Sequence, residues 1–122
     1  MPISNVITQL RTTNLAESIR FYTEMLDCTI EFKHSDFYAG IRAGDSVFHL
    51  KLVDETDPSI AFVDDGDHLH LYFVTDDVMA AAEKLRRKGV RLARDVEATA
   101  WGTREFVIHD DQGHTLYFGE PM

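Results

Sequence analysis

The side chains that could do chemistry in this sequence are an aromatic and cationic pair near the C-terminus and a scattered set of six histidines. Trp101 and Arg104 flank Gly102 in AWGTREFVIH, and DDQG then turns the chain into a second strand-like run, HTLYFGE. An indole and a guanidinium at the lip of a hairpin are either ordinary surface groups or the walls of a binding groove. Arg104 has ionic partners close by in Glu105 and Glu97, and a ligand carboxylate would serve equally well.

His70 is the best single candidate for a polar group on the floor of a cavity. The segment HLHLYFV alternates with a period of two, which sends His68, His70 and Tyr72 to one face of a strand and the apolar residues to the other. A lone histidine on a strand is as often a hydrogen-bonded core residue as a ligand-binding one. His49 in SVFHLKLV is a candidate of the same kind, and Lys51, two residues on, would point toward the same face of the strand. The remaining histidines are expected to be idle at strand ends and turns: His34, His109 and His114.

The familiar catalytic arrangements are missing from the sequence. There is no nucleophile elbow and no glycine-rich phosphate loop, because AGD and DDQG are typical of hairpin turns. Cys28 is the single cysteine, which rules out a disulfide within the chain and a thiolate metal cluster. We expect it to be a small, half-buried hydrophobic residue that follows a helix. Nothing in the sequence requires catalysis.

Length and charge restrict the class of protein. The 122 residues suffice for one domain with a real core, and no apolar run approaches the ~18 residues of a membrane span. The start, MPISNVITQLR, lacks the regions of a signal peptide, so we expect a cytoplasmic protein with no membrane partner. A net charge of −9 argues against nucleic acid and favours cationic ligands. Residues 54–67 carry six carboxylates and no base, which indicates either a solvated linker or an acidic rim beside a pocket.

The half of the chain before this acidic segment reads as a strand, a helix and three further strands. Asn14 is the expected N-cap of the helix, with Glu17 three residues on in a capping-box arrangement. Apolar residues then recur at helical spacing: Leu15, Ile19, Tyr22 and Leu26. Strands are expected at residues 6–11, 28–34, 37–43 and 46–53.

The half after the acidic segment repeats this order. Asp77 is the expected N-cap, Gly89 ends the helix, and its apolar positions are Val78, Ala81, Ala82 and Leu85. Strands are expected at residues 68–74, 90–96, 103–109 and 114–120. Superposing Asn14 on Asp77 gives an offset of 63 residues. We therefore predict a single domain, 1–122, made of one module at 1–53, an acidic linker at 54–67 and a second module at 68–122.

Each βαβββ module has one helix for one sheet, so one face of the sheet stays uncovered. In the second half this face would carry rings, which are rarely left in water. Two such sheets placed side by side can curve around a shared cavity. The sequence therefore predicts an α+β fold in which duplicated βαβββ modules form a curved mixed sheet around a cavity.

This plan, the S-x-x-F-Y-x-x-x-L pattern of NLAESIRFYTEML and the segment WGTREFVIHDDQGHTLYFGE together resemble the vicinal oxygen chelate superfamily. That superfamily includes glyoxalase I, extradiol dioxygenases, fosfomycin-resistance enzymes and bleomycin-resistance proteins, and the resemblance covers nearly the whole chain. W-G-x-R-E-F, the glycine turn and the closing L-x-F are most similar to the bleomycin-resistance branch. That branch usually has D-P-x-G at the turn, whereas this chain has Asp110-Asp111-Gln112-Gly113 and lacks the proline.

The resemblance implies four metal-ligand positions, on the first and fourth strand of each half. Carried over by the strand–helix register, they fall on Ile7, His49, His70 and Tyr117. Isoleucine offers no lone pair and a phenol with a pKa of about 10 coordinates poorly, whereas a catalytic ion commonly needs about three protein ligands. Gln9, on the same strand face as Ile7, would supply one more ligand if the register were in error. We therefore expect no cofactor, with His49 and His70 as weak candidates if a divalent metal is bound.

The resemblance to bleomycin-resistance proteins implies an antibiotic-resistance type of activity without a metal. Such a protein would sequester a planar or cationic small molecule in an aromatic-lined groove. The expected ligand-binding residues are Trp101, Arg104, Tyr38, Phe48, His49, His70, Tyr72 and Tyr117. Members of the superfamily generally dimerise, and in this branch the groove lies between subunits, so a homodimer is expected.

Two other classes of function remain open at this point. One is a metal-dependent, glyoxalase- or dioxygenase-like enzyme that acts on a substrate with vicinal oxygens. The other is an interaction domain whose uncovered sheet face packs against another subunit.

Overall fold

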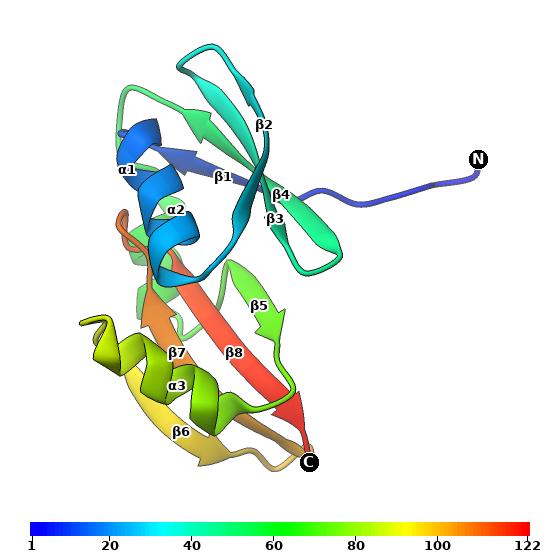
Figure 1. Ribbon diagram of the computed structural model, residues 1–122, viewed down its shortest axis with the longest axis vertical. Helices are drawn as coiled ribbons and strands as arrows, with labels where there is room; N and C mark the ends of the chain where they lie inside the picture. Colours follow the sequence, from blue (N-terminus) through cyan, green and yellow to red (C-terminus); the bar gives the residue numbers. More distant parts are fainter. The chain divides into compact units, whose positions relative to one another are not determined.

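The chain forms two four-stranded sheets, each belonging to one of two units, Met1–Asp57 and Pro58–Met122. The computed structural model describes residues 1–122, and Figure 1 labels its elements. The first unit contains β1 (Gln9–Thr12), α1 (Leu15–Arg20), its π-helical continuation η1 (Phe21–Met25), β2 (Thr29–His34), β3 (Tyr38–Ala43) and β4 (Ser46–Leu52). The second contains α2 (Ser59–Asp65), β5 (Leu71–Val74), α3 (Val78–Arg87), β6 (Arg94–Ala98), β7 (Thr103–His109) and β8 (Thr115–Pro121).

The two sheets have the same topology. Their strand orders are β1-β4-β3-β2 and β5-β8-β7-β6. In each sheet the first strand runs parallel to the fourth, and the other neighbours are antiparallel. The prediction of an α+β fold built from duplicated βαβββ modules is therefore confirmed, although each module has its own sheet.

Hydrogen-bond register fixes which residues correspond between the two sheets. β1 pairs Gln9 with His49, and β5 pairs Tyr72 with Tyr117. Gln9 and Tyr72 lie 63 residues apart, the same offset as the two helix caps, so His49 and Tyr117 occupy equivalent places on the fourth strands.

Both predicted N-caps are confirmed. The side chain of Asn14 accepts a hydrogen bond from the backbone N–H of Glu17 at 3.1 Å, and that of Asp77 accepts one from Ala80 at 3.0 Å. Their backbones are nearly identical, with φ and ψ of −147° and 91° at Asn14 and −145° and 92° at Asp77. Each cap satisfies an amide that would otherwise lack a partner, so both helices begin where the sequence indicated.

Each sheet buries the face that its helix covers (Figure 1). Leu15 and Tyr22 of the first helical segment are buried, as are Ile41 and Leu50 of the strands beneath it. In the second unit α3 buries Val78, Ala82 and Leu85, and the sheet buries Phe106, Ile108 and Leu116. The predicted amphipathic pattern is confirmed by these burials. Cys28 is also buried, and its burial, with a smaller contribution from Asp27, raises the pKa of its thiol to about 11.

Three strands begin later than the sequence indicated. β1 starts at Gln9, not at residue 6, and the preceding residues run out as an extended segment (Figure 1). β5 starts at Leu71 instead of residue 68, because the amides of Gly66 and His68 bond to carbonyls of α2. β6 starts at Arg94, because Val90 still bonds to the last turn of α3 through Leu85. For β5 and β6, therefore, residues that the sequence pattern assigned to a strand donate their backbone amides to carbonyls at the end of the preceding helix.

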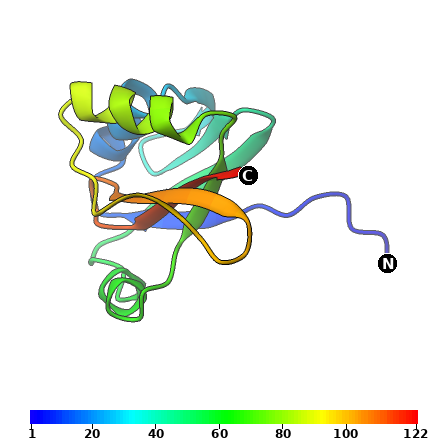
Figure 2. The same ribbon diagram turned by 90° about the horizontal axis from the view of Figure 1, so that it is seen from below.

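The sequence analysis missed helix α2, which lies inside the acidic segment. Pro58 precedes the helix and gives it no side-chain cap, so no local signal marks its start. Contacts within its own unit hold it instead, since His109 Nε2 lies 2.9 Å from Asp64 Oδ1 and Ile60 contacts Gly113. Figure 2 shows α3 on one side of the second sheet and α2 toward the other.

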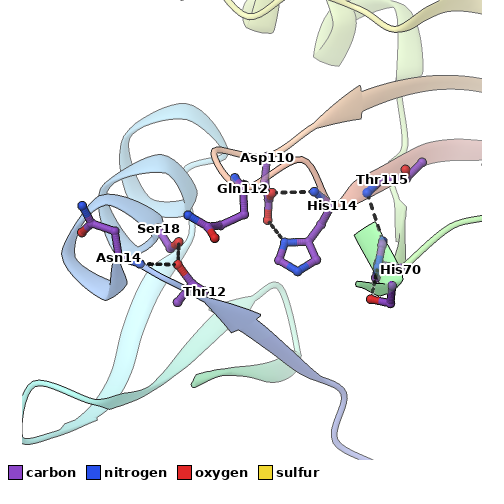
Figure 3. A network of polar contacts seen from close by, with 9 residues as sticks. Thr12, Asn14, Ser18, His70, Asp110, Gln112, His114 and Thr115 are labelled. Atoms are coloured by element: carbon purple, nitrogen blue, oxygen red, sulfur yellow. Dashed lines mark hydrogen bonds and ion pairs between the residues drawn. The ribbon is translucent and has the colours of Figure 1, made fainter. Parts of the chain in front are cut away.

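The DDQG turn is organised by Asp110. One of its carboxylate oxygens accepts from the amides of Gln112 and His114, at 3.0 and 2.8 Å, and the other lies 2.7 Å from His114 Nδ1 (Figure 3). Gly113 has φ of 100°, a value that favours glycine. These contacts close the β7–β8 hairpin without the proline that the bleomycin-resistance branch usually has.

None of the helices is long and apolar enough to cross a membrane.

We expect Asn14→Ala and Asp77→Ala each to lower the free energy of unfolding by about 1 kcal/mol. Each substitution removes the acceptor for a backbone N–H in the first helical turn that has no carbonyl partner within the helix. Chemical denaturation followed by far-UV circular dichroism measures this. Asp76→Ala is the matched control, since it removes an exposed carboxylate one residue before a cap. An equal loss in Asp76→Ala and Asp77→Ala would contradict the capping role.

Candidate functional site

The uncovered face of the first sheet carries a hydrogen-bonded row of polar and aromatic side chains. Gln9 on β1 donates from Nε2 to the hydroxyl oxygen of Tyr38 on β3, at 2.9 Å. The Tyr38 hydroxyl in turn lies 2.9 Å from Nδ1 of His49 on β4. Strand alternation explains why they share a face, because their neighbours Leu10, Ala39 and Leu50 are buried on the other. Three strands therefore contribute to one cluster.

Phe32 on β2 completes this cluster with a ring that lies across the sheet. Its ring is nearly parallel to Tyr38, at 15° and 6.2 Å between centroids, and perpendicular to His49 at 5.2 Å. Gly40 lies beneath it, where a Cβ atom would come within 2.2 Å of the Phe32 ring. Since Phe32 remains 39% exposed, it offers an aromatic surface to a ligand.

The uncovered face of the second sheet carries two tyrosines around a buried carboxylate. Tyr72 donates to Glu105 Oε2 at 2.6 Å, and Thr103 donates to the same oxygen at 3.0 Å. Glu105 is only 3% exposed, and these two neutral hydroxyls are its partners. The ring of Tyr72 lies 6.3 Å from that of Tyr117. This face thus combines rings with a negative charge that no basic side chain neutralises.

Burial, followed by the hydrogen bond to Glu105, raises the pKa of Tyr72. Ionising its phenol would remove the donor and place a second negative charge beside the carboxylate. The protonated phenol is therefore the form that the folded chain favours.

Arg94 on β6 is the cation of this second face. Its guanidinium carbon lies 5.3 Å from the centre of the Tyr117 ring, within the range of a cation–π interaction. Arg94 also forms ion pairs with Glu97 at 3.4 Å and with Asp67 at 3.8 Å. The side chain is thus held over Tyr117 by charges on both sides.

Register shows that the two faces use equivalent positions for different chemistry. Tyr38 lies two residues from the partner of His49 along β3, and Glu105 lies two residues from the partner of Tyr117 along β7. Where one copy has a tyrosine, the other therefore has a glutamate. The tyrosine that meets Glu105 comes from β5, at the position of Gln9.

The structure brings four of the predicted ligand-binding residues onto uncovered faces: Tyr38 and His49 in the first unit, Tyr72 and Tyr117 in the second. Phe48 lies elsewhere, because it is 5% exposed and packs edge-on against Tyr22 at 5.0 Å, on the helix side. It is a core residue of the first unit.

Arg104 and Trp101 also lie away from these clusters. Arg104 alternates with Glu105 and pairs in register with Glu120, whose carboxylate accepts from Val78 at the start of α3. Its side chain therefore leaves the sheet on the side of α3. Trp101 lies in the turn between β6 and β7 and is 74% exposed. Neither residue contributes to the ring-bearing face of its own sheet.

His70 lies one residue before β5, with both ring nitrogens bonded. Nδ1 accepts from the amide of Thr115 at 3.1 Å, and Nε2 lies 3.1 Å from the hydroxyl of Ser59 on α2 (Figure 3). Its ring also meets His114 edge-on at 4.8 Å. These contacts tie α2 to the end of β8, which is the structural role that the sequence analysis left open for this histidine.

Sequence reasoning missed three residues of these faces: Phe32, Arg94 and Glu105. The sequence suggested Glu105 only as an ionic partner of Arg104. Side chains alternate along a strand, so Glu105 lies on the face of the sheet that does not carry Arg104 and the buried Phe106. Phe32 and Arg94 had no such signal. Both β2 and β6 have a register shift beside these residues, which interrupts the two-residue period.

The donor atoms do not fit a catalytic metal. No three His, Cys, Asp or Glu side chains in residues 1–122 are grouped so that they could hold an ion. Of the four positions that the resemblance implied, Ile7 has no donor and Tyr117 lies under Arg94. His70 already uses both nitrogens within its own unit. His49 alone keeps a ring nitrogen without a partner, which is fewer than the roughly three protein ligands that such a site needs.

Sequence comparison assigns the chain to a family. It belongs to the Glyoxalase/Bleomycin resistance protein/Dioxygenase superfamily, whose model matches residues 5–118, so the predicted resemblance is confirmed. No curated protein sequence matches the chain significantly.

Solved structures share the fold at low sequence identity. The bleomycin-binding protein of bleomycin-producing Streptomyces verticillus, complexed with copper(II)-bleomycin, is 19% identical with a TM-score of 0.73, over 97% of this chain and 96% of that one. Lactoylglutathione lyase from Agrobacterium tumefaciens is 17% identical with a TM-score of 0.75, over 98% and 95%. A glyoxalase-related enzyme from Clostridium phytofermentans is 15% identical with a TM-score of 0.79, over 100% and 98%. The fold thus serves both binding proteins and enzymes.

We expect Tyr72→Phe to destabilise the chain by about 1–2 kcal/mol at neutral pH, because the buried Glu105 loses one of its two donors. A raised tyrosine pKa stabilises the fold below the ordinary value of about 10, and this contribution is lost as pH rises through the raised value. The wild type should therefore lose stability above pH ~10 more steeply than Tyr72→Phe.

Urea denaturation at neutral and alkaline pH measures both effects. Tyr117→Phe is the control, because its hydroxyl contacts the Asp67 carbonyl and Arg94 and does not bond to Glu105. Equal behaviour of the two variants would show that the bond between Tyr72 and Glu105 does not contribute.

Proposed function

We propose that the chain is a metal-independent binding protein that sequesters a planar or cationic small molecule in an aromatic-lined groove. The observation that carries this proposal is the set of half-exposed rings on the uncovered sheet faces: Phe32, Tyr38 and His49 in one unit, Tyr72 and Tyr117 in the other. Flat rings bury a large apolar area at a small cost in conformational entropy, which suits them to stacking on planar molecules.

Charge supports the cationic part of this proposal. The net charge is −9, and the buried carboxylate of Glu105 accepts a hydrogen bond from the Tyr72 hydroxyl. An acidic protein attracts cations over a distance, and ring faces attract them at contact. A planar cation would therefore gain from both effects.

One comparison supports binding of a small molecule, and the donor groups of this chain support binding without a metal. The bleomycin-binding protein of Streptomyces verticillus has this fold and holds copper(II)-bleomycin. In the present chain, the donors at the superfamily's ligand positions do not make up a metal site. In this proposal stacking and apolar burial on the ring faces hold the ligand, and polar groups set its orientation.

A metal-dependent lyase or dioxygenase is the alternative, because the fold is shared with lactoylglutathione lyase. Metal analysis of protein purified without a chelating tag separates the two functions. A stoichiometric ion that is lost in His49→Ala would favour the enzyme and contradict the present proposal.

We expect the protein to bind copper(II)-bleomycin or a smaller planar cation, and Tyr38→Leu and Phe32→Leu each to weaken binding by about three- to tenfold. Leucine keeps apolar volume but removes the ring face, which is worth about 0.5–1.5 kcal/mol. Isothermal titration calorimetry measures the affinity, with ethidium as the smaller probe.

Phe62→Leu is the matched control, because it removes an aromatic ring that is 78% exposed on α2, outside both clusters. Trp101→Leu tests the remaining predicted residue in the same way. If binding is unchanged in Tyr38→Leu and Phe32→Leu, or falls equally in Phe62→Leu, the ring faces are not the binding surface.

We further propose a homodimer, as the superfamily resemblance implies. Exposed apolar residues support it, since Ile3 and Val6 in the N-terminal segment are 73% and 81% exposed. Sedimentation equilibrium should give about twice the chain mass of 13.9 kDa. A stable monomer across the micromolar range would contradict this part of the proposal.

A further inference from the structure

The hydrogen bonds of the first sheet favour one position for the proton of His49. Gln9 donates to the oxygen of Tyr38, so that oxygen acts as an acceptor toward β1. The single hydroxyl proton of Tyr38 is then free to point at Nδ1 of His49, 2.9 Å away. With the proton in that position, Nδ1 is the acceptor nitrogen of the imidazole. In a neutral imidazole the other nitrogen, Nε2, must carry the proton.

The Nε2–H group of His49 is left without a partner within the chain. The residue is half-buried, and its one polar contact is the bond from Tyr38 to Nδ1. A half-buried donor that no protein group satisfies is suited to an acceptor on a ligand. By contrast, the other histidine that the sequence singled out, His70, uses both of its nitrogens within its own unit.

An aromatic surface lies beside this donor. The Phe32 ring is perpendicular to the His49 ring at 5.2 Å and nearly parallel to that of Tyr38. Only a glycine fits beneath Phe32, since a Cβ at Gly40 would overlap the ring. The ring can therefore lie down on the sheet, with its other face available for stacking.

We infer that the first sheet recognises planar ligands that carry a hydrogen-bond acceptor at their edge, such as a carbonyl oxygen or a ring nitrogen. The ligand stacks on Phe32 while its acceptor takes the Nε2–H of His49. Gln9 and Tyr38 are positioning residues, because their hydrogen bonds fix whether Nε2 of His49 donates to the ligand or accepts from it. This inference rests on the proposed function and deepens it, because it names the ligand class.

A variant that reverses the hydrogen bonds from Gln9 through Tyr38 to His49 tests the assigned position of the His49 proton. In Gln9→Glu the carboxylate can only accept, so the Tyr38 hydroxyl turns toward it and its oxygen accepts from Nδ1–H of His49. Nε2 then becomes an acceptor. Tyr38→Phe keeps the ring but removes the hydroxyl, so neither tautomer is enforced.

Long-range ¹H–¹⁵N spectra of His49 at about pH 8.5, well above the ordinary imidazole pKa of about 6.5, report the tautomer directly. We expect the Nε2–H form in the wild type, the Nδ1–H form in Gln9→Glu and a mixture in Tyr38→Phe. An Nδ1–H tautomer in the wild type would overturn the inference whatever the protein binds, and would leave the proposed function intact.

Two bicyclic fragments of similar size then test recognition. Coumarin offers a carbonyl acceptor, and indole offers an N–H donor. By NMR titration we expect wild type to prefer coumarin by about three- to tenfold, the usual contribution of one hydrogen bond. Gln9→Glu should reverse the preference, and Tyr38→Phe should abolish it. Gly40→Ala should weaken both fragments equally, because it lifts the Phe32 ring and leaves the donor in place.

The outcomes separate this inference from the broader function. Equal affinities of the wild type for both fragments, with shifts at Phe32 and Tyr38, would overturn the acceptor specificity while supporting a ring-bearing binding face. No shifts at these residues with either fragment, together with no binding of planar cations, would overturn both.

Discussion

The packing of one helix over one face of each four-stranded sheet is the constraint on which the rest of each unit depends. In the second unit α2 adds contacts near His70, His109 and Gly113. Side chains alternate along a strand, so every residue of a sheet faces either its helix or the uncovered side. The helix side is filled by apolar packing, as where Phe106 stacks on Phe118 at 4.9 Å. The uncovered side carries rings, hydroxyls and a carboxylate that satisfy one another. The interacting polar and aromatic side chains therefore lie on the face of each sheet that is turned away from its helix-covered core.

Duplication gave the chain two uncovered faces with one backbone plan and different contents. In the first sheet a tyrosine hydroxyl on β3 lies between an amide and an imidazole. In the second, a tyrosine hydroxyl on β5 meets a carboxylate on β7, and an arginine lies over a second tyrosine. The second face thus holds a buried carboxylate and an arginine that have no counterpart in the cluster of the first.

Local sequence signals predicted the fold well, because helix caps and strand alternation are decided by near neighbours. Asn14 and Asp77 are examples, since each bonds an amide three residues on. Helix α2 escaped prediction because tertiary contacts such as His109 with Asp64 hold it in place of a cap. Alternation places Tyr72 on the uncovered face, and the register that the resemblance implies selects His49 and Tyr117. The register shifts beside Phe32 and Arg94 conceal the face on which those two residues lie.

Both faces rest on a glycine. Gly40 leaves room for the Phe32 ring, and Gly119 leaves room for the Tyr72 hydroxyl, which would lie 1.9 Å from a Cβ atom. A single methyl group at either position would tilt a ring without touching the helix-covered core. The orientation of the rings on both faces therefore depends on backbone positions that carry no side chain.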